Sequence, residues 1–232
     1  MLFIEIMKHE IMSKRKTLSA IKMTLFLIIN IVMISCGSGG PAPKEGQAAK
    51  ADGTVIDLAK VSKKIKDMVE FAASVKEIEI LVKSVDELAK AIGKKIKNDG
   101  TLENEAGKNG SLIAGVHSVI SAVKTKVGVL ETISGISNEL KTKITEVKNK
   151  VETFLGKLKE KSADLGKNEV GDEDAKKAID RTSQPNGDKG AKELGDLNTA
   201  ISALLTSAKD ALDGSINKLI EEQPAKPAVS GS

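Results

Sequence analysis

The sequence predicts an all-α protein, an elongated antiparallel bundle of four to five helices in which the first and last helices are long. Apolar residues recur at steps of three and four over most of 54–222, as they do along one face of an α-helix. The chain has no Trp, no Tyr and only four Phe in 232 residues, so Leu, Ile, Val and Ala must supply the core. Helices that each carry one apolar stripe bury it against one another, which produces a bundle.

The first helix is expected over 55–97, because no proline interrupts this stretch. Asp52 or Thr54 is placed to cap its start, and residues 98–100 (Asn-Asp-Gly) provide a stop. The apolar residues repeat with a mean step of about 3.5, which favours left-handed superhelical packing. The expected stripe is Val61, Ile65, Met68, Ala72, Val75, Ile78, Val82, Val85, Ala89, Ile92 and Ile96.

The same spacing predicts four further helices, of which the third is short. Ser137 is a suitable N-cap for one of them, and Glu139 is favourable in its first turn. Residues 98–110 are expected to be a surface loop, as are the parts of 166–190 outside the short helix. The four helices are expected over 111–133, 137–165, 172–181 and 191–222.

A secretory leader is predicted before Cys36, the only cysteine of the chain. Residues 12–16 (MSKRK) are basic, and residues 23–34 are almost entirely apolar. A run of about 12 residues is too short to cross roughly 30 Å of hydrocarbon at 1.5 Å per residue. It fits the apolar region of a signal peptide instead.

The leader ends in Met33-Ile34-Ser35-Cys36. Apolar residues, a small residue and a cysteine in this order resemble the lipobox of spirochaetal lipoproteins, which tolerate Ser before the cysteine. The resemblance implies cleavage between Ser35 and Cys36, a diacylglyceryl thioether on the sulfur, and acylation of the new amine by a fatty acid such as palmitate. Several acyl chains on one residue give a lasting membrane anchor, whereas one chain alone binds only marginally.

Four segments follow from these patterns. Residues 1–35 are the signal peptide, with the true start expected at Met12 because residues 1–11 place acidic side chains ahead of the basic cluster. Residues 36–53 are rich in Gly, Pro and Ala and are expected to be a lipidated flexible tether. Residues 54–222 form the helical bundle domain, and 223–232 are expected to be a disordered tail.

Charge and composition argue against nucleic-acid binding. Five of the 36 basic residues and two of the 32 acidic residues precede Cys36, so the rest of the chain is nearly neutral. A nucleic-acid-binding body carries a basic stripe or aromatic side chains on which bases stack, and this body has neither.

No catalytic, cofactor or metal site is predicted, and we expect no enzyme. His117 is the only His after Cys36, and it lacks the Cys or carboxylate partners of a triad or a metal site. The glycines form neither a phosphate loop nor a dinucleotide fingerprint, and residues 171–174 lack the spacing of a calcium loop. We interpret His117 as an exposed or edge residue of the second helix.

The sequence indicates two candidate interaction surfaces. Ile80 points away from the main stripe of the first helix, so exposed apolar surface there predicts a homodimer. Two lysine clusters are expected at the ends of the first and third helices, where they either complement the helix dipoles or attract a plasma protein or sulfated glycan. The candidate host-ligand patch consists of Lys94, Lys95, Lys97, Lys157, Lys159 and Lys161.

Several stretches resemble the variable small proteins of relapsing-fever Borrelia, which are similar to outer surface protein C of the Lyme spirochaetes. The resemblance implies a mostly helical, often dimeric lipoprotein of the cell outer membrane that faces the exterior. It also implies a role as a major antigen that evades immunity by antigenic variation, with host antibodies as partners; the alternative function is an adhesin. The stretches that carry the resemblance are 36–67, 70–79, 82–96, 112–116 and 192–211.

Overall fold

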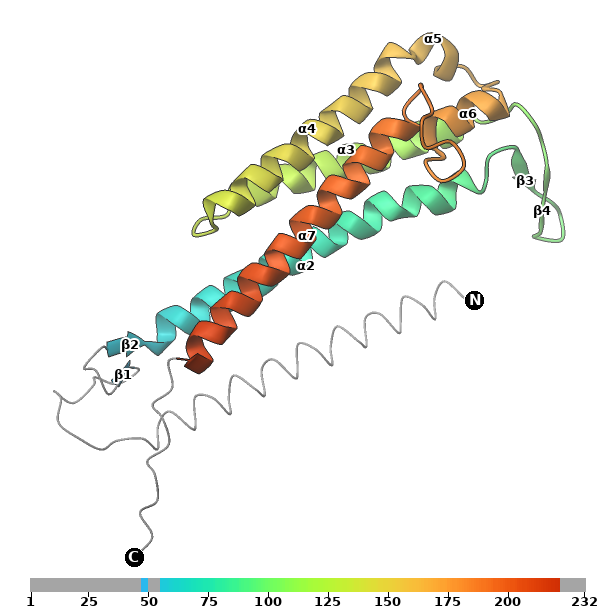
Figure 1. The fold of residues 1–232 in the computed structure, drawn as a ribbon. Coiled ribbons are helices and arrows are strands. Elements are labelled where there is room, and N and C mark those ends of the chain that lie inside the picture. Colours follow the sequence, from blue (N-terminus) through green and yellow to red (C-terminus); the bar gives the residue numbers. More distant parts are fainter. Residues whose placement is uncertain (1–46, 50–54, 222–232) are drawn as a thin grey trace, which may run out of the picture. The chain divides into compact units, whose positions relative to one another are not determined.

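The computed structural model describes residues 47–49 and 55–221 (Figure 1). The predicted signal peptide, Cys36, most of the tether and the predicted tail lie outside the described residues. The elements in chain order are β1 Gln47–Ala49, β2 Val55–Asp57, α2 Leu58–Ala89, β3 Lys94–Ile96, β4 Leu102–Asn104, α3 Gly110–Glu131, α4 Asn138–Glu160, α5 Ser162–Leu165, α6 Asp172–Ile179 and α7 Ala191–Glu221. The chain is therefore all-α in character, as predicted.

The described residues fall into two compact units. The larger unit is Asp67–Asp213, and the smaller one contains β1, β2 and residues 58–66 and 214–221. In the smaller unit β1 pairs antiparallel with β2, with Gln47 opposite Asp57. β1 thus lies within the range that was expected to be a flexible tether.

Asp57 caps the first helix, in place of the expected Asp52 or Thr54. Its Oδ1 accepts a hydrogen bond from the backbone N–H of Lys60 at 3.0 Å, which is the usual geometry of an N-cap. This hydrogen bond lowers the pKa of Asp57. Because Val55 and the next two residues form β2, the helix begins at Leu58 rather than Val55.

Four long helices build the larger unit, and neighbours along the chain run antiparallel (Figure 1). Ion pairs between helices show which helices lie side by side. Lys126 with Glu77 joins α3 to α2, Lys148 with Glu131 joins α4 to α3, and Lys150 with Asp196 joins α4 to α7. One continuous apolar core lies between the helices, and Phe71 and Phe154 are its largest members.

The core face of α2 repeats every three or four residues without a break. Its buried apolar residues are Ile65, Met68, Phe71, Val75, Ile78, Val82, Val85 and Ala89. The spacing predicts Ala72 in this stripe, but the larger Phe71 is 1% exposed and Ala72 is only partly buried. Burying Phe71 removes more apolar surface from water, which decides the rotation of the helix at this turn.

The first helix ends at Ala89, not at Lys97 as predicted. Gly93 follows with φ +66°, a left-handed conformation that favours glycine. Residues 94–96 then form β3, which pairs antiparallel with β4, and Ile96 lies opposite Leu102. Ile96 is 75% exposed, so it does not belong to the core stripe as expected.

The segment 98–110 is therefore not a plain surface loop. It contains β4 and the turn of a β-hairpin, in which Asp99 accepts hydrogen bonds from the N–H and hydroxyl of Thr101 at 2.8 and 2.6 Å. Gly100 has φ +82°, so the predicted helix stop is a hairpin turn.

The remaining helices lie close to their predicted positions. Ser137 caps α4 as expected, because its hydroxyl accepts the N–H of Leu140 at 3.2 Å. The predicted third helix divides at Lys161 into α4 and the short α5. Among the described helices, α3 alone is long and apolar enough to cross a membrane, and six of its apolar side chains are buried in the bundle core instead.

Candidate functional site

The predicted lipid site lies outside the described residues. Cleavage and lipidation at Ser35 and Cys36 therefore stay predictions from the sequence, and so does the host-ligand patch of six lysines. The described residues do, however, place those six lysines and define what surrounds them.

The first lysine cluster lies on a strand and not at a helix end, so the predicted position of this cluster was wrong. Lys94 and Lys95 belong to β3, and Lys97 directly follows that strand. The Nζ of Lys95 lies 3.4 Å from the Glu103 carboxylate and 3.6 Å from that of Glu105. The hydrogen bond to Glu103 raises the pKa of Lys95, so the lysine stays charged. The carboxylates of Glu103 and Glu105 offset its positive charge.

The second cluster, at the end of α4, is also largely paired. Lys157 and Lys161 share the carboxylate of Glu160, at 2.8 and 3.1 Å. Lys159 forms no ion pair or side-chain hydrogen bond among the described residues, and the same holds for Lys97 in the first cluster. No ion pair or hydrogen bond between described residues joins the two clusters.

A buried polar junction, which no motif in the sequence predicts, lies at one end of the larger unit. Asn109 is 2% exposed. Its Oδ1 accepts the N–H of Gly93 at 2.8 Å, and its Nδ2 donates to the carbonyl of Val170 at 2.9 Å and to Asp172 Oδ1 at 2.8 Å. One side chain thus connects the loops that follow α2, precede α3 and precede α6.

Asp172 completes this arrangement, which we call the Asn109 junction (Gly93, Gly107, Asn109, Val170 and Asp172). Its Oδ1 also accepts the N–H of Gly107 at 2.9 Å, and this hydrogen bond lowers the pKa of Asp172. A Cβ on Gly93 would lie 2.5 Å from Asp172 Oδ2. The junction therefore requires glycine at 93 for both its positive φ and its lack of a side chain.

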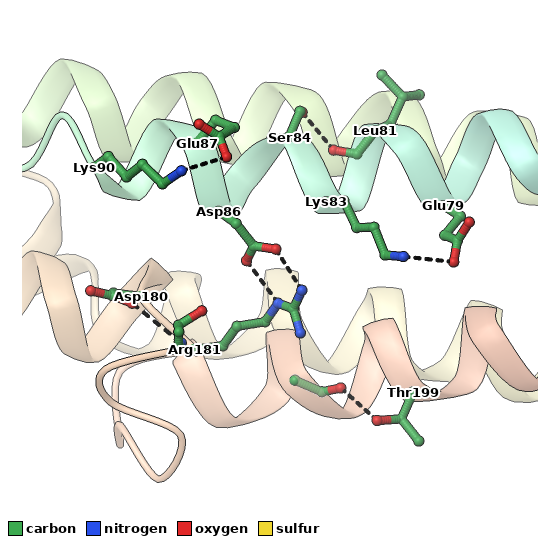
Figure 2. A network of polar contacts seen from close by, with 12 residues as sticks. Glu79, Leu81, Lys83, Ser84, Asp86, Glu87, Lys90, Asp180, Arg181 and Thr199 are labelled. Carbon is green, nitrogen blue, oxygen red and sulfur yellow. Dashed lines mark hydrogen bonds and ion pairs between the residues drawn. The ribbon is translucent and has the colours of Figure 1, made fainter. Parts of the chain in front are cut away.

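A second polar contact fixes α2 against the segment after α6 (Figure 2). Arg181 donates from Nε and Nη2 to the two carboxylate oxygens of Asp86 at 2.9 and 2.6 Å. This bidentate geometry is the most directional ion pair available to proteins. Both side chains are about one-fifth to one-quarter exposed, at 19% and 26%, so the contact is partly shielded from water.

Glu79 is a buried acid on α2, with 5% of the residue exposed. Burial alone would raise its pKa, but Lys76 and Lys83 donate hydrogen bonds to its two carboxylate oxygens at 2.5 and 2.9 Å. These contacts outweigh burial, so the pKa of Glu79 lies below its usual value. The interaction belongs to the scaffold, since all three side chains come from one helix.

His117 is exposed on α3, as the sequence predicted for an edge residue. It lines a hollow between the start of α3 and the end of α4. Among the described residues, no group of three or more His, Cys, Asp or Glu side chains is placed to hold a metal ion.

Comparisons with known proteins agree with this architecture. A family profile, Lipoprotein_6, described as Lipoprotein, matches residues 55–225. Variable small protein 11 of Borrelia hermsii is 48% identical over 91% of this chain and 99% of its own length. Outer surface protein C of Borreliella burgdorferi is 43% identical over 92% of this chain and 100% of its own length. The solved structure of variable small protein 1 of Borrelia turicatae is 59% identical, covers 70% of this chain and 99% of that chain, and gives a TM-score of 0.66.

We expect Asn109→Ala to lower the free energy of unfolding by about 2–3 kcal/mol, because it leaves the buried Gly93 N–H without its acceptor and removes the side-chain hydrogen bonds to the Val170 carbonyl and to Asp172. Urea denaturation followed by circular dichroism measures the change. Asn149→Ala is the matched control, since Asn149 is exposed on α4 and should change stability by less than about 0.5 kcal/mol. Equal midpoints for the two variants would contradict the role of the junction.

We expect Glu79→Gln to lower stability at pH 7 and to have little effect at low pH. The pKa of Glu79 is depressed in the folded chain, so its stabilisation is complete above the unfolded value of about 4.3 and disappears as pH falls through the folded pKa. Denaturation midpoints of both proteins between pH 7 and pH 2 should therefore converge. Glu87→Gln, which removes an exposed i,i+3 pair from the same helix, should cost no more than about 0.5 kcal/mol at any pH.

Proposed function

Because the chain belongs to the lipoprotein family of the variable small proteins and outer surface protein C, we propose that it is a lipid-anchored surface antigen of the outer membrane. The observation that carries the proposal is the close relationship over nearly the whole length of named outer surface proteins. The predicted lipobox before Cys36 supplies a chemical means of anchoring, independent of any relative.

The finer function that we propose is that of a variable major antigen in immune evasion. The arrangement of the larger unit supports this role. Its stability comes from apolar seams inside the bundle, whereas most of the charged side chains lie on its exposed surface. Exposed substitutions usually change stability by less than about 0.5 kcal/mol, so the surface can be altered while the scaffold is kept. We also propose that the chain is not an enzyme, since its named relatives are surface lipoproteins.

We propose homodimerisation as well, as the sequence indicated for Ile80. That side chain is half-buried within the single chain, which leaves part of it available to a second copy. Sedimentation of the chain without its lipid, at micromolar concentration, distinguishes a monomer from a dimer.

We expect Cys36→Ala to abolish lipid attachment. Cells grown with radioactive palmitate should label the native protein but not the variant, and the variant should leave the membrane fraction. Ser38→Ala, two residues further along, is the matched control and should remain labelled. Palmitate label on the Cys36→Ala protein would contradict the lipid anchor. Protease treatment of intact cells should remove the native protein without lysis. A native protein that resists the protease would contradict its exposure on the cell surface.

The adhesin alternative depends on the lysines that have no local partner, Lys97 and Lys159. If the chain binds sulfated glycans through the candidate patch, Lys97→Gln with Lys159→Gln should weaken retention on heparin. Lys141→Gln with Lys209→Gln removes the same charge from exposed positions outside the patch, and this double variant should be retained on heparin more strongly than the first. Equal retention of the two double variants would refute the patch.

A further inference from the structure

Two of the three large apolar side chains that the described residues expose lie opposite each other on the hairpin of β3 and β4. Ile96 is 75% exposed, and its cross-strand partner Leu102 is 59% exposed; the third side chain, Val129, lies on α3. Directly opposite residues of an antiparallel pair have Cβ atoms about 5 Å apart, so Ile96 and Leu102 form one continuous apolar surface. A single exposed apolar side chain is ordinary, whereas a contiguous apolar surface indicates a contact site.

The register of the hairpin separates this apolar surface from the acidic side chains. Side chains alternate between the two faces of a strand, so four residues share what we call the apolar face: Lys94, Ile96, Leu102 and Asn104. The apolar face carries no acidic residue. The opposite face carries Glu103, which pairs with Lys95 at 3.4 Å.

Two lysines of the hairpin have no carboxylate partner. Lys94 donates to the neutral Oδ1 of Asn104 at 2.6 Å, and neither Lys94 nor Lys97 forms an ion pair within the described part of the chain. The acidic side chain nearest the turn, Asp99, accepts hydrogen bonds from Thr101. The hairpin thus presents positive charge beside an exposed apolar pair.

The hairpin is also free to make a contact without disturbing the core. It projects from the end of α2 (Figure 1), and the side chains of both its strands are exposed or half-buried. A lipid bilayer accommodates a projecting apolar pair without a matching cavity, whereas a protein partner would need a pocket of the right shape.

We propose that the apolar face of the hairpin docks onto a lipid bilayer that contains anionic lipids. Ile96 and Leu102 enter the interfacial region, where they leave water, and the ammonium groups of Lys94 and Lys97 contact the anionic headgroups, which attract basic side chains near the surface. This contact is separate from the predicted lipid on Cys36 and does not depend on it.

The lack of Trp in the chain permits a direct test. Ile96→Trp places a single fluorophore at the proposed contact, and Val129→Trp places it at an exposed position of α3 as the matched control. Both are made in the chain from residue 36 to 232 carrying Cys36→Ala, which removes the covalent lipid. With vesicles of equal parts phosphatidylcholine and phosphatidylglycerol, the emission of Ile96→Trp should shift to the blue and be quenched by brominated acyl chains, whereas that of Val129→Trp should not change.

Because Trp itself favours the membrane interface, the native pair is tested by co-sedimentation with the same vesicles. Ile96→Thr with Leu102→Thr keeps residues that suit a strand and should lower the partition coefficient about tenfold or more. Val129→Thr, the same kind of change outside the hairpin, should leave it unchanged.

The charge requirement is tested in the same assay. Lys94→Gln with Lys97→Gln should lower the partition coefficient about tenfold, while Lys141→Gln with Lys209→Gln, at exposed lysines elsewhere, should have a smaller effect. Vesicles of phosphatidylcholine alone should bind the native chain about tenfold more weakly, and added salt should weaken binding to the anionic vesicles.

Four results would overturn the proposal: no emission shift of Ile96→Trp with anionic vesicles, an equal shift of Val129→Trp, native binding by the Thr double variant, or equal binding to neutral and anionic vesicles. An emission shift of Ile96→Trp with serum proteins but not with vesicles would overturn it in favour of a protein partner. Circular dichroism spectra identical to that of the native chain verify that each variant is folded.

Discussion

The bundle depends on burying one aliphatic stripe from each long helix in a shared core. With no Trp or Tyr and only Phe71 and Phe154 in the core, the interior is filled by many Val, Ile, Leu and Ala side chains that are fully or almost fully buried. Each of them contributes about 1–3 kcal/mol by leaving water. Because no single side chain is dominant, the regular three-and-four spacing itself holds the helices in register.

Local sequence was sufficient to predict the helices whose ends are marked by local chemistry. Ser137 caps α4 through a hydrogen bond to a residue three positions away, and Gly135, with φ +82°, separates α4 from α3. α7 was predicted almost to the residue, because its stripe runs uninterrupted between a glycine-rich loop and a proline-containing tail.

The end of the first helix could not be predicted in this way. Residues 90–96 continue the helical spacing through Ile92 and Ile96, and their lysines are good helix formers. Partners that lie far along the chain override this tendency: Asn109 binds the Gly93 N–H from 16 residues away and reaches Asp172 across 63. The same limit applies to the candidate sites. The lipobox is a contiguous motif, whereas the apolar face of the hairpin depends on the register between β3 and β4, and the lysines on β3 were assigned to the wrong kind of element.

The Asn109 junction has a consequence for the hairpin beside it. The backbone N–H of Glu105 donates to the carbonyl of Gly93 at 2.8 Å, so the two ends of 94–104 are joined at a closed neck. The hairpin exposes Ile96 and Leu102 and buries none of its side chains in the bundle. We therefore expect residues 94–104 to be replaceable. A peptide of different length or composition, inserted between Gly93 and Glu105, would be exposed on the surface and would leave the packing of the bundle unchanged.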